Sequence, residues 1–384
     1  MDMNLPEELQ LLQKTAREFA ESELTKAARE MDEHEEFKVE VFKKLASLGL
    51  AGLTLPEQYG GAGFYESKLA NQAACVVLEE INRVCASTGV TLSVHMSLFS
   101  SALNKWGSDE LKGRILPRVA TGEWIGAYCL SEAGAGSDAG SLTCTAKKDG
   151  NEYVLNGSKL WITSAPYADV YLVMARTSDS HKTRGISAFI VERSRKGVSI
   201  GKHEKKMGIR GSSTCEVLFD NCRIPAANLI GEEGKGFTIA LDTLDGGRIG
   251  ISAQAVGIGR ACLEESIAYA KQREQFGKKI AEFQGVQWMI CDMAARIDAA
   301  RLLMYRAATL RDAGQPCAKE AAMAKLYASE AANKAAKDAV QIFGGNGYSK
   351  EYNVERYFRD AKITEIYEGT SQIQRIVVSR ALLG

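Results

Sequence analysis

The hydrophobic residues of this 384-residue chain change their spacing twice, and this change limits the folds open to it. Up to about residue 120 they recur at the three- and four-residue spacing of a helix face, as in Leu9, Leu12 and Ala16. Between about 122 and 230 the spacing falls to two, which is typical of strands. After Gly236 the helical spacing returns. The sequence therefore predicts an α+β protein whose β-domain lies between two helical domains, at residues 1–121, 122–231 and 232–384.

Turn and cap residues punctuate these regions. Asp149-Gly150 separates two alternating runs and predicts a hairpin turn. Short strand-like runs spaced by Gly, Asn, Asp and Pro follow up to residue 220, which indicates an antiparallel sandwich or barrel. An Ala-rich segment at 319–343 lacks Gly and Pro and stops at Gly344-Gly345, so we expect a helix that ends in a glycine cap.

Charge and composition exclude several classes of protein. Lys and Arg number 48 and so do Asp and Glu, and a zero net charge argues against a nucleic-acid partner. No apolar stretch is long enough to cross a bilayer, and the acidic N-terminus is unlike a signal peptide, so we expect no membrane insertion. Nine dispersed cysteines with no C-x-x-C pair, and only four histidines, predict reduced thiols in a cytosol-like compartment and no metal site.

Signatures of several common enzyme classes are missing. The sequence has no dinucleotide-binding G-x-G-x-x-G after a strand, no P-loop, no G-x-S-x-G elbow and no H-E-x-x-H. Four other segments carry candidate chemistry, each with a structural alternative. The glycine-rich segment 130–140 suits close approach to an anion or forms a flexible surface loop. Trp161 and Thr163 suit a planar cofactor, although a tryptophan in the core is commoner.

Two further segments are equally open to interpretation. Asp245-Gly-Gly-Arg248 places a cation beside two glycines, which suits an anionic or thioester ligand or a turn that interrupts a helix. Arg273 and Gln284 suit a pyrophosphate group or a solvated helix end. For His95 a half-buried structural role is favoured over metal ligation, since no second ligand stands at metal spacing.

Glu368 is the most suggestive residue. It stands just before Thr370, a candidate N-cap of the final helix, so its carboxylate is expected in a turn among apolar and aromatic side chains. Such surroundings raise the pKa of a carboxylate and make it usable as a general base.

Six segments together resemble the acyl-CoA dehydrogenase family of flavoenzymes. They are YCLSEAGAGSD from residue 128, WITS from 161, LDGGRIG from 244, REQFG from 273, QIFGGNGY from 341 and IYEGTSQIQ from 366. The resemblance runs along the whole chain and implies the family's fold, with an N-terminal helical domain, a middle antiparallel β-domain and a C-terminal four-helix bundle. The chain departs from the family pattern at Ala133, where Pro is usual, and at Gln372, where Glu is frequent.

The resemblance also implies roles. Glu368 is expected to remove the α-proton of an acyl-CoA while the β-hydrogen leaves as hydride to the flavin of FAD. The implied cofactor-binding positions are Tyr128, Leu130, Ser131, Ser137, Trp161, Ile162, Thr163, Arg273, Phe276, Gln284, Gln341, Ile342, Phe343, Gly344, Gly345, Thr370, Ser371 and Gln372. The implied substrate positions are Ser137, Asp245, Gly246, Gly247, Arg248 and Gly369.

The implied partners follow from the same family. Arg273, Gln284 and residues 341–345 would reach the FAD of a neighbouring subunit, so a homo-oligomer, most simply a homotetramer, is expected. Electrons would pass to an electron-transfer flavoprotein. Gln254 and Thr364 stand where short-chain members close the acyl pocket, which favours a short acyl group such as butyryl.

The alternatives are a branched or cyclic acyl-CoA, an acyl-CoA oxidase, and a helical flavin-binding scaffold without catalysis. The length of the chain argues against the oxidase, and the intact Glu368 motif argues against the scaffold. The Met1 start favours a bacterial cytoplasm over a mitochondrial matrix reached after removal of a presequence.

Overall fold

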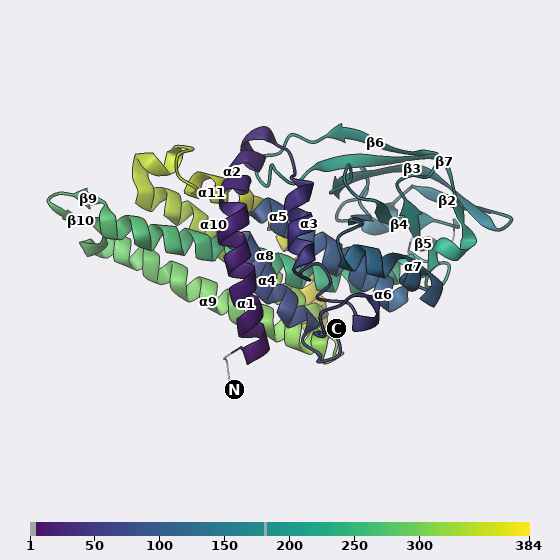
Figure 1. Ribbon diagram of the computed structural model, residues 1–384, viewed down its shortest axis with the longest axis horizontal. Coiled ribbons are helices and arrows are strands. Elements are labelled where there is room, and N and C mark those ends of the chain that lie inside the picture. Colours follow the sequence, from purple (N-terminus) through teal and green to yellow (C-terminus); the bar gives the residue numbers. More distant parts are fainter. Residues whose placement is uncertain (1–4, 180–182) are drawn as a thin grey trace.

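The computed structural model describes residues 5–179 and 183–384, and its elements follow the predicted helix–strand–helix order (Figure 1). Leu9, Ala16 and Phe19 are buried along one face of the first helix, as their spacing predicts. Two π-helical turns, η1 (Ala20–Leu24) and η3 (Val94–Ser100), interrupt the N-terminal helices. These helices are α1 (Glu7–Phe19), α2 (Thr25–His34), α3 (Val39–Ser47), α4 (Ala70–Val84), α5 (Ala86–Ser93), α6 (Ser101–Trp106) and α7 (Asp109–Ala120).

The middle region forms one sheet of eight strands. They are β1 (Gly126–Cys129), β2 (Thr145–Asp149), β3 (Glu152–Thr163), β4 (Val170–Arg176), β5 (Ile186–Glu192), β6 (Val198–His203), β7 (Thr214–Pro225) and β8 (Leu229–Ile230). The order is β6-β7-β3-β2-β4-β5-β8, with β1 beside β4. The hairpin at Asp149-Gly150 is confirmed, because Asp149 pairs with Glu152. Most pairings are antiparallel as expected, but β1 and β2 each pair with β4 in parallel, which the alternation of residues did not predict.

The C-terminal region is helical. It comprises α8 (Gly236–Gln272), a hairpin of β9 (Glu274–Gln275) and β10 (Lys278–Lys279), α9 (Gln284–Asp312), α10 (Ala318–Phe343), α11 (Val354–Ile363) and α12 (Ser371–Leu383). The helix predicted at 319–343 is confirmed and ends at Gly344, whose φ is 59°. Gly246 and Gly247 lie inside the continuous helix α8, so the alternative of a helix-interrupting turn is wrong.

Two cores hold these regions together. The side chains of β4 alternate between the two cores. Leu172 and Met174 join the core shared with the helices, whereas Tyr171 and Val173 join a second core on the other face of the sheet. A strand covered on both faces is apolar throughout, which is the pattern of β4 and β5. The sheet is thereby fixed to the helical half.

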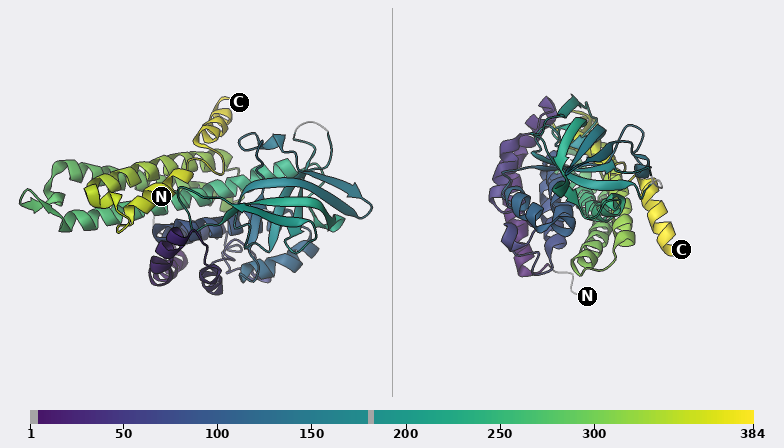
Figure 2. Two further views of the ribbon diagram at one scale, coloured as in Figure 1. Left: turned by 90° about the horizontal axis from the view of Figure 1, so that it is seen from above. Right: turned by 90° about the vertical axis from the view of Figure 1, so that its right-hand side faces the viewer.

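The longest helix connects the two ends of the molecule. α8 packs against α4, α9 and α10 and also reaches β4 and β5. The sheet lies at one end, and the β9–β10 hairpin lies at the tip of the other (Figure 1). α12 projects from the side of the body at the C-terminus (Figure 2). Within residues 5–179 and 183–384, no helix has the length and apolar character needed to cross a membrane.

Candidate functional site

Glu368 lies in the turn between α11 and α12. Thr370 caps α12 as predicted, since its hydroxyl accepts a hydrogen bond of 3.3 Å from the backbone N–H of Ile373. Glu368 has a φ of 52° and Gly369 a φ of 90°, so two successive residues occupy the left-handed region. A glutamate seldom adopts this conformation, and it persists only where the surroundings hold it.

The carboxylate of Glu368 is enclosed. The residue as a whole keeps some exposed surface, but Oε2 is buried and has no hydrogen-bond partner. It presses against Gly247 of α8, where an added Cβ would stand 1.7 Å from Oε2. Burial raises the pKa of Glu368 to about 7, against the opposing charges of Lys325 and Arg248. The carboxylate is therefore ready to exchange a proton near neutral pH.

Other polar atoms around Glu368 are also buried and unpartnered. They include Nε of Arg248, the hydroxyl of Tyr128, Oγ of Ser371 and Oε1 of Gln374. Nη1 of Arg248 donates to Asp245 at 2.5 Å, so its Nε remains available. Burial, and then the charge of Glu368, raise the pKa of Tyr128, which keeps the phenol protonated as a donor. Because buried polar groups are normally satisfied, this group of atoms is suited to a polar ligand.

A buried ion pair shapes the glycine-rich segment. Lys159 of β3 is fully buried, and its Nζ donates to Glu132 Oε1 at 2.7 Å and to the carbonyl of Leu130 at 3.1 Å. The carbonyl of Ser131 accepts a hydrogen bond of 2.9 Å from the N–H of Leu160. The alternative of a flexible loop is wrong for Leu130 and Ser131, which are tied to β3, whereas Ser137 is exposed.

Trp161 lies on β3, as predicted, but not in the core. The register of β3 against β7 shifts between Lys159 and Ile162, and Trp161 within this bulge has a φ of 63°. Its side chain is 57% exposed, so the alternative of a core tryptophan is wrong. Bulges of this kind re-aim side chains beside functional sites. The Ile162 side chain is buried in the sheet core, whereas Thr163 is half-buried.

A second group of the expected cofactor-binding residues lies far from this site. Arg273, the 93% exposed Phe276 and Gln284 surround the β9–β10 hairpin. Phe343 stacks on Tyr269 with ring centroids 4.0 Å apart, which brings the end of α10 to the same place. There Gln341, Gly344 and Gly345 are exposed, and Ile342 and Phe343 are buried. This end is opposite the sheet that carries Trp161, so one chain does not bring the two groups together (Figure 1).

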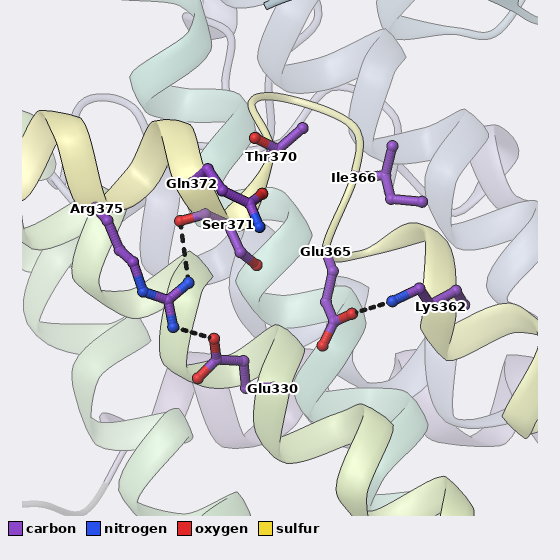
Figure 3. A pocket seen from close by; sticks show the side chains of 8 residues that line it. All are labelled: Glu330, Lys362, Glu365, Ile366, Thr370, Ser371, Gln372 and Arg375. Atoms are coloured by element: carbon purple, nitrogen blue, oxygen red, sulfur yellow. Dashed lines mark hydrogen bonds and ion pairs between the residues drawn. The ribbon is translucent and has the colours of Figure 1, made fainter.

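Residues 370–372 line a cavity of about 330 Å³ at the start of α12 (Figure 3). Arg375 on its wall is bound by Glu330 at 2.6 Å, and Lys362 by Glu365 at 2.5 Å. The N-terminus of a helix favours negative charge, and here it opens beside an arginine.

His95 and the cysteines take structural places. His95 is fully buried rather than half-buried; its Nε2 lies 2.9 Å from the carbonyl of Val119, and its Nδ1 accepts from the N–H of Gly126 at 3.2 Å. Burial lowers the pKa of His95 to about 4, so the ring is neutral. Eight of the nine cysteines are buried and Cys291 is exposed. In the described part of the chain, no group of three or more His, Cys, Asp or Glu could hold a metal ion.

Three family models match the chain in sequence order. They describe the N-terminal domain of acyl-CoA dehydrogenase at residues 6–123, its middle domain at 127–222 and its C-terminal domain at 234–383. The chain belongs to the acyl-CoA dehydrogenase family. It has that family's fold of helical, β-sheet and helical domains, and it is an acyl-CoA dehydrogenase, a flavin-dependent oxidoreductase.

Relatives of this acyl-CoA dehydrogenase support activity on short acyl chains. The short-chain specific acyl-CoA dehydrogenase of Clostridium acetobutylicum is 48% identical over 379 residues, which are 99% of each protein. The solved butyryl-CoA dehydrogenase of Megasphaera elsdenii is 42% identical with a TM-score of 0.98, and the match covers both chains fully. A chain solved in work on the electron transferring flavoprotein of Acidaminococcus fermentans is 46% identical with a TM-score of 0.97, again over both full chains.

The sequence does not single out four residues that shape the candidate site: Glu132, Lys159, Lys325 and Gln374. Each acts through a contact whose partner lies elsewhere in the chain or in the next turn of backbone. One signal was present, because Lys325 stands on the buried stripe of α10 with Ala321 and Ala328 at helical spacing.

Proposed function

We propose that this enzyme uses FAD to oxidise a short-chain acyl-CoA to the trans-2-enoyl-CoA, with Glu368 as the general base. The observation that carries the proposal is the buried, unpartnered Oε2 of Glu368, held against the Cβ-less Gly247 with a pKa of about 7. A carboxylate with this pKa is ionised in about half of the molecules at neutral pH and is basic enough to accept a proton.

The chain's own residues account for the proton side of the reaction. Glu368 removes the proton from the α-carbon of the acyl-CoA, and the α,β double bond forms as the β-hydrogen leaves with its electron pair. The flavin, when bound, supplies the acceptor for that hydride. Proton removal needs stabilisation of the negative charge that develops on the thioester oxygen. The backbone N–H of Glu368, held in its left-handed turn, is suited to donate to that oxygen.

The residues fit FAD. The exposed indole of Trp161 on its bulge offers a flat surface for a ring system, beside the main chain of Leu130 and Ser131. The cavity at residues 370–372, beside Arg375, suits a phosphate-bearing part of the cofactor. Arg248 and Asp245 would face the acyl-CoA, since Nε of Arg248 lacks a partner. Because Ile162, Ile342 and Phe343 are buried, we propose that they contribute main-chain contacts only.

We propose that FAD is held between chains. Arg273, Phe276, Gln284 and residues 341–345 lie at the end of the molecule opposite Trp161, so they serve the same cofactor only if another chain supplies them (Figure 1). The 93% exposure of Phe276 and the 90% exposure of Tyr348 at this end support a contact between subunits. A homotetramer is the assembly we propose.

The acyl group is proposed to be short because the space behind Glu368 is filled. Gln254 is fully buried; its Nε2 donates to the carbonyl of Ala86 at 3.1 Å, and its Oε1 accepts from the hydroxyl of Tyr367. Thr364, also fully buried, donates to the carbonyl of Ala361 at 2.7 Å. These side chains are fixed and polar, so they oppose a longer apolar chain.

Two further proposals rest on the relatives. We propose an electron-transfer flavoprotein as the electron acceptor, supported by the Acidaminococcus likeness. We also propose a bacterial cytoplasmic enzyme, and the bacterial origin of these relatives supports the bacterial part of that proposal. Domain limits of 1–121, 122–231 and 232–384 are proposed from the start of β1 at Gly126 and of α8 at Gly236.

The proposal is tested by anaerobic mixing of the FAD-loaded enzyme with a panel of acyl-CoAs from butyryl to octanoyl. We expect butyryl-CoA to bleach the flavin fastest. An unbleached flavin across the panel, including branched and cyclic acyl-CoAs, would overturn the dehydrogenase proposal, and faster bleaching by octanoyl-CoA would overturn the short-chain one.

The base is tested by Glu368→Gln, which keeps the size of the side chain but cannot take the proton. Flavin reduction should slow by about 10²- to 10⁴-fold, the usual contribution of a general base. FAD content should be unchanged. Reduction at the wild-type rate would place the base elsewhere.

A further inference from the structure

The two peptide groups beside Glu368 are held by buried donors from two helices. Nε2 of Gln374 in α12 donates to the carbonyl of Glu368 at 3.1 Å and to the carbonyl of Gly369 at 2.8 Å. Nζ of Lys325 in α10 donates to the carbonyl of Gly369 at 2.7 Å. A Cβ at Gly369 would stand 2.7 Å from Nε2 of Gln374 and the φ of Gly369 is 90°, so glycine is strongly favoured at this position.

Lys325 is an unusual residue to find here. Its side chain is fully buried on a helix face lined mainly by alanines, and burying an ammonium group costs several kcal/mol unless its surroundings compensate. Burial lowers the pKa of Lys325 to about 8, although the charge of Glu368 raises it. Its hydrogen bond goes to a neutral carbonyl, so this amine is poorly explained as a device for stability.

The charge of the same amine also acts on the carboxylate of Glu368. The charged groups acting on Glu368 are Lys325 from α10 and Arg248 from α8. The phenols of Tyr128 from β1 and Tyr367 from the turn itself also feel its charge. Arg248 shares its charge with Asp245, whereas the largest opposing charge acting on Lys325 is that of Glu368, followed by that of Glu365.

We propose that Lys325 is a positioning residue for proton removal: together with Gln374 it fixes the left-handed turn at Glu368 and Gly369, and its charge favours the ionised form of the Glu368 carboxylate. The inference rests on the proposed role of Glu368 as base. Fixing the turn also fixes the N–H of Glu368, which we assigned to the thioester oxygen.

The test is Lys325→Met, which keeps the unbranched side chain apart from its last atom and removes its charge and its donors. FAD-loaded enzyme is mixed anaerobically with butyryl-CoA between pH 6 and pH 9, and the rate of flavin reduction is measured. We expect the rate at saturating substrate to fall by about tenfold to a hundredfold, as for a misplaced catalytic group. The concentration for half-saturation should change little, and the rise of rate with pH should move to higher pH because a favourable cation is lost.

Two variants separate this from a general loss of structure. Gln374→Leu removes only neutral hydrogen bonds, so it should slow reduction without moving the pH dependence. Lys337→Met changes an exposed lysine on the same helix and should leave both unchanged. If Lys325→Met fails to fold, Gln374→Leu still tests the turn, and a wild-type rate in that variant would overturn the inference.

The outcomes also distinguish the inference from its premise. Retained activity in Glu368→Gln would refute the proposed role of Glu368 as base, and with it the premise of this inference. Loss of activity in Glu368→Gln, with a wild-type rate and pH dependence in Lys325→Met, would leave the base in place and refute the role of Lys325.

Discussion

Two carboxylates in this molecule are enclosed by helices, yet their surroundings oppose one another. Glu80 of α4 is fully buried and accepts hydrogen bonds from Arg260 at 2.9 Å and from Arg17 at 3.0 Å. Burial raises the pKa of Glu80, but these arginines lower it by more, to about 2. Glu368 has an unpartnered Oε2 and a pKa raised to about 7. Burial alone therefore makes neither a structural nor a reactive carboxylate; the number of donors decides.

Glu80 and Glu368 also differ in which of their atoms contact the rest of the protein. Glu79 joins Glu80 and accepts from Arg260 and Arg301, both at 2.7 Å, so four helices meet at one ionic cluster. Glu368 is held through its backbone instead, by Lys325 and Gln374, and its carboxylate is left without a hydrogen bond to Oε2. One arrangement uses the charge to join helices, and the other leaves the carboxylate free for the base role that we propose.

The largest expected effect is that of Glu80→Gln, which tests whether Glu80 is the structural carboxylate of the two. An amide cannot balance the buried arginines, and removing one partner of a buried ion pair costs about 3–5 kcal/mol. We expect the free energy of unfolding in urea at pH 7 to fall by that amount. Glu264→Gln, at the exposed edge of the same cluster, is the matched control and should cost less than about 1 kcal/mol. Equal losses in the two variants would show that Glu80 is not the centre of the cluster.

Glu368→Gln should have the opposite effect on stability. The native state holds the Glu368 proton more tightly than the unfolded chain does, so ionisation costs stability as the pH rises from about 4.5 to about 7. At pH 8 the variant should gain up to about 3 kcal/mol in free energy of unfolding, and the gain should shrink at pH 5. A loss of stability at pH 8 like that of Glu80→Gln would contradict the contrast between the two sites.

Gly247→Ala tests the surroundings of Glu368 by adding a single methyl group. Its Cβ would stand 1.7 Å from Oε2 of Glu368, so the carboxylate must move away. We expect the rate of flavin reduction to fall by about tenfold or more, since small displacements of a catalytic group are costly. Gly113→Ala in α7 has open space around it and should gain about 1 kcal/mol with no change in rate. Matching rates in Gly247→Ala and the wild type would show that the carboxylate has room to relax.

The order of the domains could be predicted from the sequence because hydrophobic spacing is a local property. The long helix before Gly344, the hairpin at Asp149-Gly150 and the cap at Thr370 are each determined within a few residues, and all three are confirmed. The motif around Glu368 also places it in a turn. Local chemistry therefore carried most of the fold and the position of the candidate base.

The contacts that shape the site could not be predicted in the same way. Gly247 and Glu368 meet although more than one hundred residues separate them; the sequence marks the segment around Gly247 as a candidate ligand site, but nothing in it points to Glu368 as the neighbour. Lys159 on β3 pairs with Glu132 only when the fold brings β3 beside the glycine-rich segment. The parallel pairings of β4 likewise depend on strands distant in the chain. Such contacts depend on the complete topology, which a single sequence does not display.

The length of α8 sets the stoichiometry of the proposed enzyme. Gly247 beside the base and Arg273 beyond the helix end are about 40 Å apart along one straight helix, since each residue rises about 1.5 Å. In the proposed arrangement, with FAD held between chains, each chain therefore carries two different half-sites at a fixed separation. In an open assembly of subunits, one half-site at each end has no complementary half-site from a neighbouring subunit. In a closed assembly every half-site has one. For this chain, the number of working flavin sites then equals the number of subunits only when the ring of contacts is complete.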